Sequence, residues 1–244
     1  SREIKEAVRN GVKIICAAVP YHSDDVLRSN PDLRGRIVGI DFNYWTPDAL
    51  EKIAEKGFKE LNIVYDEDFM LAVAKEAAGS PQLMQALCLN ICFEIDVYAK
   101  GTMKIVPNDK EFLEKVCIRT SLMTDYSSIV EKLKEGPKTR GTERNRHTLK
   151  DGASYDVYPI VLRALAADPP ELTFRYQNLQ ERINSLCMGT IPSGSSITGA
   201  CNHIYEIGNS VSGSVIIEWD GENDVLDIRD PYLLFYLRWA AFSK

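Results

Sequence analysis

Apolar positions near the start of the chain come in short unbroken runs and lack helical spacing. Residues 12–19 and 37–42 form the two clearest runs. Such runs are typical of strands that are buried on both faces of a parallel sheet. Each run follows a segment expected to be helical. The order helix, strand, helix, strand predicts the edge of an α/β sheet over residues 1–45.

After Trp45, apolar positions recur every three to four residues, which is the spacing of amphipathic helices. Thr46 is suited to cap the first helix, and Pro47 is suited to its first turn. The pattern predicts four helices, at residues 47–61, 66–78, 80–98 and 109–134. We therefore expect a small all-helical domain over residues 46–135.

A polar, basic stretch at residues 136–152 is predicted to be a linker or an exposed loop. Beyond it the pattern predicts helices at 155–167, 177–186, 196–207 and 231–242, and strands at 172–174, 214–219 and 225–229. The last two strands flank Asp220-Gly221-Glu222-Asn223, a favourable hairpin turn. This order is that of a winged helix-turn-helix, expected over residues 153–244. The predicted fold is mostly α overall: an α/β edge, a helical domain and a winged helix.

The net charge of −6 is unevenly distributed along the chain. Residues 138–150 hold five Lys or Arg against one Glu, whereas residues 151–244 hold 6 Lys or Arg against 12 Asp or Glu. The predicted helix at 196–207 contains no Lys or Arg, and the hairpin turn is acidic. Because phosphate neutralisation supplies most non-specific affinity, duplex DNA is not an expected partner. Asn202 is able to read adenine, so nucleic-acid binding stays open as a minority alternative.

Cysteine and histidine spacing indicates no metal or disulfide framework. The six cysteines are Cys16, Cys88, Cys92, Cys117, Cys187 and Cys201. They lie within apolar patterns, which predicts reduced, buried thiols in a cytoplasmic protein. No apolar run approaches the roughly 18 residues of a membrane span. The chain begins with Ser1 instead of Met, so we expect a fragment of a longer protein.

Three segments follow one another in an informative order. They are the run at 12–19, the segment 45–61 followed by Ala-Gly-Ser-Pro-Gln-Leu at 78–83, and Asp-Pro-Tyr-Leu-Leu-Phe-Tyr-Leu-Arg-Trp at 230–239. They resemble the sensor-1 strand, the helical lid with its GxP signature, and the end of the winged helix in P-loop ATPases of the AAA+ superfamily. The resemblance is closest to the STAND-like and archaeal-ATPase branch and spans nearly the whole chain.

The resemblance implies roles for particular residues. Pro81 would pack against an adenine ring, with Gly79 and Ser80 beside it. Arg36, or as a second choice Arg34, would reach a γ-phosphate as an arginine finger, since a guanidinium suits the charge of a transferring phosphoryl group. Plainer interpretations compete with these roles. Ser80 and Pro81 also suit a helix start, and both arginines suit the surface end of a strand.

The chain departs from the family pattern in several places. No GxxxxGK[ST] occurs, so no loop of backbone N–H groups cradles phosphates. The sensor-1 strand ends without a polar side chain, and Gln82 stands where a sensor-2 arginine is often found. Residues 61–67 superficially resemble a Walker-B strand. Their position between two helices instead predicts a connection in which Asp66 caps the second helix.

These observations favour the interpretation that this chain is the C-terminal lid and winged-helix portion of an ATP-dependent switch or remodelling ATPase. We do not expect this portion to be catalytic alone. The resemblance implies ATP or ADP with Mg in the parent protein, and no cofactor tightly bound to this chain alone. Expected partners are an upstream P-loop domain, or self-association through it, and a protein docked on the winged helix. No membrane partner is expected. The alternatives are a winged-helix nucleic-acid-binding regulator and a protein-interaction module without nucleotide contact.

Overall fold

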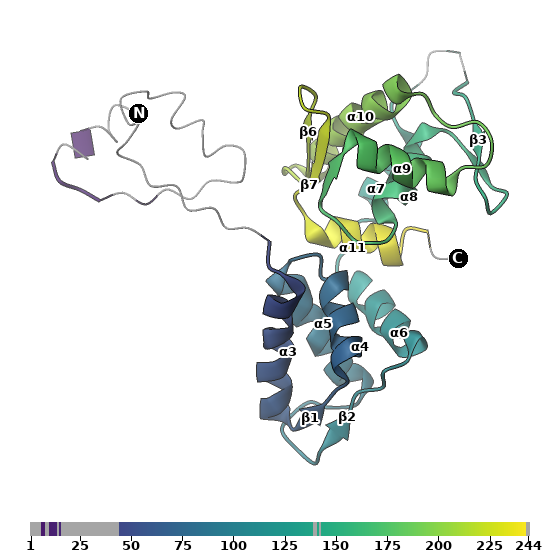
Figure 1. Ribbon diagram of the computed structural model, residues 1–244. Coiled ribbons are helices and arrows are strands. Elements are labelled where there is room, and N and C mark those ends of the chain that lie inside the picture. Colours follow the sequence, from purple (N-terminus) through teal and green to yellow (C-terminus); the bar gives the residue numbers. More distant parts are fainter. Residues whose placement is uncertain are drawn as a thin grey trace. The chain divides into compact units, whose positions relative to one another are not determined.

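The computed structural model describes residues 6–7, 10–13, 15, 44–138, 141 and 143–242. The chain divides into two compact units, residues 1–43 and residues 44–244. In the first unit, the described residues of the predicted strand at 12–19 belong to no strand, and Ile15 is 98% exposed. The rest of the predicted sheet edge lies outside the described residues. The second unit is mostly helical, as predicted (Figure 1).

The second unit begins with a bundle that we call the helical half. Its helices are α3 (Pro47–Leu61), α4 (Glu67–Glu76), α5 (Pro81–Glu94) and α6 (Lys110–Ser121). Each helix follows a residue whose side chain accepts a hydrogen bond from a backbone N–H three positions on. These caps are Thr46, Asp66, Ser80 and Asp109. They satisfy amide groups that a helix start leaves unpaired, which explains why these helices begin where they do.

Two short strands lie at one end of the helical half. β1 (Ile63–Val64) pairs in parallel with β2 (Lys104–Ile105). The segment 61–67 therefore connects two helices, as predicted, and its strand-like residues also form the short strand β1. Each strand is only two residues long, so it leaves no alternation of apolar and polar positions.

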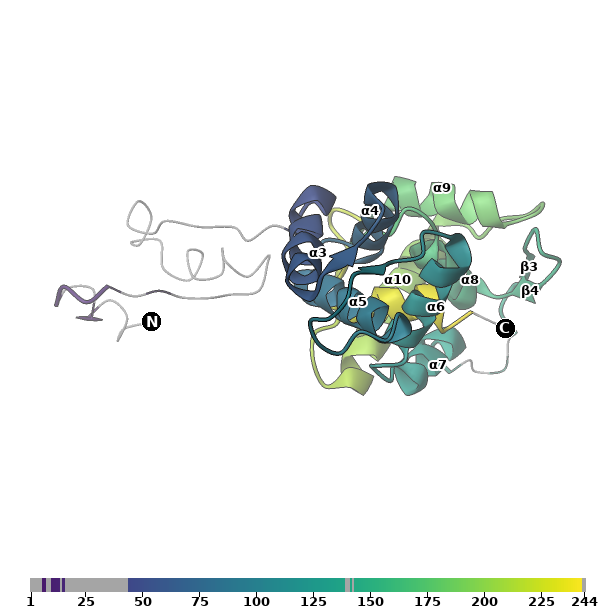
Figure 2. The same ribbon diagram turned by 90° about the horizontal axis from the view of Figure 1, so that it is seen from below.

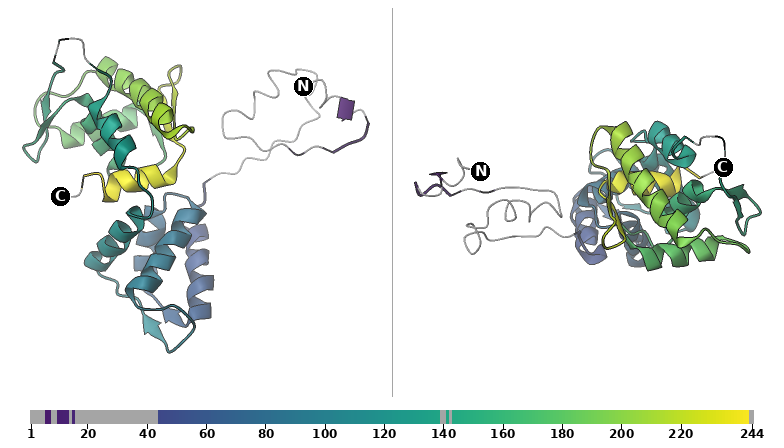
Figure 3. Two further views of the ribbon diagram at one scale, coloured as in Figure 1. Left: turned by 180° about the vertical axis from the view of Figure 1, so that it is seen from behind. Right: turned by 90° about the horizontal axis from the view of Figure 1, so that it is seen from above.

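The remaining elements form what we call the C-terminal half. Its helices are α7 (Ser127–Glu135), α8 (Val157–Ala166), α9 (Tyr176–Leu186), α10 (Gly194–Ser212) and α11 (Pro231–Trp239). β5 (Thr173–Arg175), β7 (Val225–Ile228) and β6 (Ile217–Asp220) form an antiparallel sheet in that spatial order. The β6–β7 hairpin lies beside α10 (Figure 3). From α8 onward, the predicted order of helices and strands is the observed one.

The predicted single helix at 109–134 is wrong, because the chain breaks between α6 and α7. At the break, the Asp125 carboxylate accepts a hydrogen bond from the backbone N–H of Ser127 at 2.9 Å. Val130 and Leu133 of α7 are buried in the core of the C-terminal half. The two helices therefore bury their apolar faces against different cores, which a continuous helix would not allow.

The later part of the basic connector (residues 136–152), from residue 143 on, contains regular structure that the predicted linker or exposed loop lacks. β3 (His147–Thr148) and β4 (Ser154–Tyr155) pair as an antiparallel hairpin. The Arg144 guanidinium lies 4.5 Å from the centroid of the Tyr158 ring and 2.8 Å from the Asp156 carboxylate. It also donates to the backbone oxygens of Glu135 and Pro137. Contacts within the fold thus compensate the positive charge of Arg144, whereas Lys150 is exposed to solvent.

Helix α11 joins the two apolar cores. Leu233, Leu234 and Leu237 are buried in the core of the C-terminal half, whereas Phe235 is buried in the core of the helical half. α11 contacts α6 on one side and α8 on the other. Figure 1 shows α11, in yellow, between the two halves, and Figure 2 shows it behind α5 and α6. The two halves are thus packed on a shared helix.

Replacing Phe235 with Ala should weaken the joint between the halves. The cavity left in the helical half should lower the free energy of unfolding by about 3–5 kcal/mol. We expect the halves of this variant to unfold in separate transitions, measured by hydrogen exchange on peptides from α3–α6 and α7–α10 during a urea titration.

Phe174→Ala is the matched control. Phe174 is as buried as Phe235, at 1% exposure, but lies in the core of the C-terminal half alone. This variant should lose comparable stability and keep a single transition. Coincident transitions in Phe235→Ala would contradict the joining role of α11.

Candidate functional site

A cleft of about 460 Å³ lies where the helical half meets the segment between α8 and β5. The residues that line it from the helical half are Tyr44, Trp45, Pro47, Ala74, Lys75, Ala78 and Gly79. The opposite wall consists of residues 169–173. Most of these side chains are apolar, and a cleft of this size and character is suited to a small flat ligand.

The turn between α4 and α5 shapes one wall of the cleft. Ala78 and Gly79 have φ angles of 46° and 81°, in the left-handed region. The Gly79 carbonyl accepts a hydrogen bond from the Trp45 backbone N–H at 3.0 Å. A Cβ atom on Gly79 would lie 2.6 Å from the Cβ of Tyr44. Only glycine fits this close approach, and it places the half-exposed Tyr44 and Trp45 side chains beside the turn.

The structure separates the three residues of the predicted adenine contact. Gly79 lines the cleft, whereas Ser80 and Pro81 do not. The Ser80 hydroxyl is buried and accepts a hydrogen bond from the Leu83 N–H at 3.2 Å, while Pro81 occupies the first turn of α5. Ser80 and Pro81 thus act as a helix start. Arg34 and Arg36 lie outside the described residues.

Two charged side chains face the cleft from opposite walls. Lys75, near the end of α4, is exposed. Glu171 lies 3.0 Å from the Arg182 guanidinium and accepts a hydrogen bond from the Asn178 amide. The negative charge is therefore neutralised locally, and the cleft presents one exposed ammonium group to a ligand.

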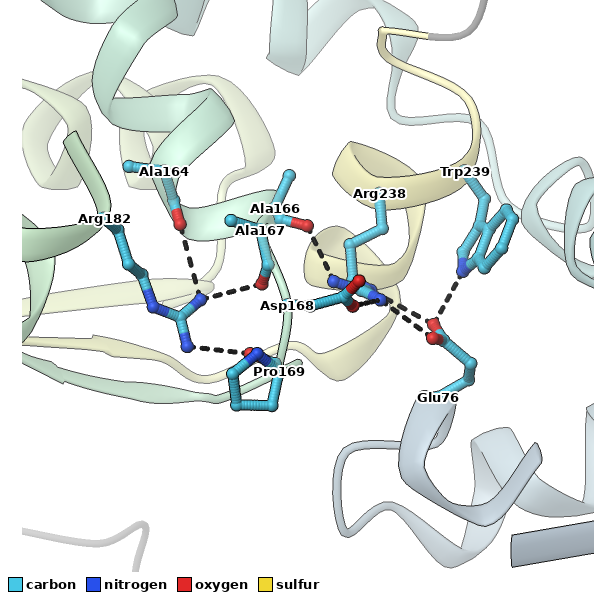
Figure 4. A network of polar contacts seen from close by, with 9 residues as sticks. All are labelled: Glu76, Ala164, Ala166, Ala167, Asp168, Pro169, Arg182, Arg238 and Trp239. Atoms are coloured by element: carbon cyan, nitrogen blue, oxygen red, sulfur yellow. Dashed lines mark hydrogen bonds and ion pairs between the residues drawn. The ribbon is translucent and has the colours of Figure 1, made fainter. Parts of the chain in front are cut away.

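Behind the cleft, Arg238 of α11 makes a buried network of polar contacts (Figure 4). Its guanidinium donates to both carboxylate oxygens of Glu76, at 3.1 and 2.8 Å, and to the Ala166 carbonyl at 2.7 Å. A further contact of 2.6 Å reaches Asp168. The Trp239 indole N–H also donates to Glu76, at 2.8 Å. The side chains of Arg238 and Glu76 are only 7% and 12% exposed.

The contacts of Arg238 compensate for its burial. Burial alone would lower the pKa of its guanidinium, but hydrogen bonds and charges from Glu76 and Asp168 outweigh that effect, so the pKa is raised. The charge is therefore stable throughout the physiological pH range. A planar guanidinium that binds both oxygens of one carboxylate also fixes the orientation of its partner.

A second arginine holds the wall opposite α4. Arg182 of α9 donates to the carbonyls of Ala167 and Pro169, each at 2.8 Å, and more weakly to that of Ala164 at 3.4 Å. Its guanidinium lies 4.9 Å from the centroid of the Phe174 ring. Both arginines thus satisfy carbonyl groups where the backbone leaves α8 without a regular hydrogen-bond partner.

Sequence reasoning did not identify Glu76, Asp168, Arg182 or Arg238 as site residues. Arg238 lies within the quoted segment 230–239, but its partner Glu76 is 162 positions away. No local pattern connects residues so far apart. The one available signal was the charged residue in an otherwise apolar final helix.

Other chemistry is limited in the described part of the chain. The cysteines that the structure describes, Cys88, Cys92, Cys117, Cys187 and Cys201, are free and buried. Burial raises the pKa of the Cys88 and Cys201 thiols to about 12, which keeps both thiols protonated. Among the described residues, no group of three or more His, Cys, Asp or Glu is placed to hold a metal ion. No described helix has the length and apolar character needed to cross a membrane.

Replacing Gly79 with Ala should deform the cleft. The substitution forces a Cβ into a left-handed position and against Tyr44, so we expect a loss of about 1–3 kcal/mol of stability. The environment of Trp45 should change as well, seen as a shift in its indole N–H resonance.

Gly57→Ala provides the matched control, because Gly57 is exposed within α3 and a Cβ there meets nothing within 4 Å. This change should stabilise the protein by up to about 1 kcal/mol, since Ala favours a helix interior. Equal stability of Gly79→Ala and the unaltered protein would show that the turn tolerates a side chain.

Comparison with known proteins does not assign this chain to a family. No protein-family model matches this chain, and no match was found to a curated protein or to a solved structure. The function must therefore be inferred from the cleft and from the motifs around it.

Proposed function

We propose that this chain is the lid and winged-helix portion of a nucleotide-driven AAA+ or STAND-like ATPase, with the cleft at Gly79 facing the adenine of bound ATP or ADP. The observation that supports this most is the position of Gly79. The glycine of the GxP-like segment lines an apolar cleft, directly beside two half-exposed aromatic side chains. Aromatic and apolar walls of this kind favour stacking of a planar base.

The charge distribution in the cleft is compatible with a nucleotide. Lys75 offers an exposed ammonium group to a phosphate, and Glu171 is already paired with Arg182. A single lysine supplies far less than the cradle of backbone N–H groups in a phosphate loop. The phosphates and Mg would be bound mainly by a P-loop domain, upstream or on another chain, that docks on this one or drives its self-association. Arg36 or Arg34 remains the proposed arginine finger.

The C-terminal half has features that support its assignment as a winged helix. The chain order is α8, β5, α9, α10, β6, β7, and the β6–β7 hairpin, which pairs with β5, would be the wing. Its surface favours a protein partner over DNA. α10 has no Lys or Arg, and the hairpin turn is acidic. The Asn202 amide, the candidate for reading adenine, donates to Glu206 at 3.0 Å.

Cytoplasmic localisation belongs to the same proposal. ATP-driven switches act where ATP is abundant, and buried free thiols persist in a reducing compartment. The competing proposal, a protein-interaction module without nucleotide contact, differs in one measurable respect. It requires no affinity of the cleft for a nucleotide.

The purified chain should hydrolyse no ATP and should bind ADP or ATP weakly, with a Kd on the order of 1 mM or higher, because no phosphate loop is present. We expect ADP to shift the Trp45 indole resonance. In Trp45→Ala, ADP should no longer shift the resonances of the other residues that line the cleft.

Tyr98→Ala is the control, because Tyr98 is an exposed aromatic residue (76%) that does not line the cleft. It should leave ADP binding unchanged. Sustained ATP hydrolysis that co-purifies with the chain would overturn the assignment as a non-catalytic portion. Absence of any ADP-induced shift would favour the interaction module.

The C-terminal half of the intact chain should bind duplex DNA poorly at physiological salt. The acidic hairpin turn repels phosphates within a Debye length of about 8 Å, and α10 brings no cation to the groove. Any residual binding by the whole chain should disappear when the connector residues Lys138, Arg140, Arg146 and Lys150 become Ala.

Arg144 is left intact in that experiment because it supports the hairpin through Asp156. A mobility-shift titration measures both effects. Submicromolar binding without the connector charges would instead support the nucleic-acid-binding regulator.

A further inference from the structure

One side chain makes polar contacts beside both walls of the cleft. Arg238 binds Glu76, which adjoins Lys75 on the α4 wall. The same guanidinium binds Asp168 and the Ala166 carbonyl, immediately before Pro169 on the opposite wall. Figure 4 shows the guanidinium between the carboxylates of Glu76 and Asp168.

The connection is stiff where it meets α4 and more adaptable where it meets Asp168. Glu76 is 12% exposed and is held by two donors, Arg238 and the Trp239 indole. Asp168 is 86% exposed, so its contact with Arg238 faces water. Exposed ion pairs contribute little and exchange readily, whereas the buried pair is costly to break.

We propose that Arg238 is the positioning residue of the cleft: it sets the distance between the walls, so that nucleotide binding and the attachment of α11 to α4 are energetically coupled. This inference rests on the proposed function for the identity of the ligand. The positioning role itself does not depend on the ligand. Coupling is reciprocal, so a nucleotide that changes the wall spacing must also act on the Arg238–Glu76 pair.

Trp45 and Trp239 report the two ends of this connection. The Trp45 backbone is bonded to Gly79 in the cleft wall, and the Trp239 indole N–H is bonded to Glu76. Trp219, on β6, lines neither the cleft nor the network and serves as the internal reference. The three indole N–H resonances of ¹⁵N-labelled protein therefore separate an effect on the cleft from a general one.

The experiment compares Arg238→Lys and Glu76→Gln with a matched control, Arg229→Lys. Arg229 is paired with Glu218 and is similarly buried, at 10% exposure, but it follows β7 and does not itself line the cleft. Lysine keeps the charge of Arg238 but cannot bind both oxygens of Glu76 and Asp168 together. Glutamine keeps a hydrogen-bond acceptor for Trp239, which guards against a loss of folding. Circular dichroism checks that each variant is folded.

Without ligand, Arg238→Lys and Glu76→Gln should each shift the Trp45 resonance, and Arg229→Lys should not. With ADP, the unaltered protein should show coupled shifts of Trp45 and Trp239 with the same Kd. Arg238→Lys should weaken ADP binding about five-fold or more, and Arg229→Lys should leave it within about two-fold.

An unmoved Trp45 resonance in both Arg238→Lys and Glu76→Gln would overturn the positioning role. Equal ADP affinity in Arg238→Lys and an unaltered protein that binds ADP would overturn the coupling between nucleotide binding and the Arg238–Glu76 pair. If ADP shifts no tryptophan in any protein while Arg238→Lys still moves Trp45, the proposed nucleotide function fails and the positioning role of Arg238 is upheld. The two failures are therefore distinguishable.

Discussion

The buried contact between Arg238 and Glu76 is the interaction on which the arrangement of the second unit depends. Two charges that are 7% and 12% exposed have lost most of their hydration. That cost is offset because both carboxylate oxygens are occupied and the guanidinium also reaches a carbonyl and Asp168. Breaking such a pair from one side leaves an uncompensated charge and typically costs about 3–5 kcal/mol. The geometry of α11 against α4 is therefore closely specified.

Apolar packing and this ion pair act on the same helix. α11 places Phe235 in one core and its leucines in the other, so its burial stabilises both halves. Apolar contact is not directional, however, and tolerates small shifts of a helix. The two oxygens of Glu76 and the planar guanidinium fix the angle that packing leaves open. Both walls of the cleft adjoin this contact, so the same contact also constrains the positions of the walls.

The proposed lid function follows from this placement. For a nucleotide-binding surface to act as a lid, nucleotide binding has to change how two parts of the chain pack together. The cleft at Gly79 lies between the helical half and the segment before β5, and the Arg238 partners Glu76 and Asp168 adjoin the lining residues Lys75 and Pro169 in the chain. A surface at the acidic hairpin would then present the state of the cleft to a protein partner.

Local chemistry determined much of this protein from sequence alone. Thr46, Asp66 and Ser80 cap their helices because a side-chain oxygen and an amide three residues away are close in any such turn. Gly79 could be singled out because glycine commonly ends a helix in the left-handed region, and the hairpin turn at Asp220 because its residues favour a tight turn. Only the tertiary structure decided the rest. It split the helix predicted at 109–134, paired β1 with β2, turned the basic connector into a hairpin, and joined Glu76 to Arg238. The pairing of β1 with β2 and of Glu76 with Arg238 depends on groups far apart in the chain, which meet because whole apolar faces pack together.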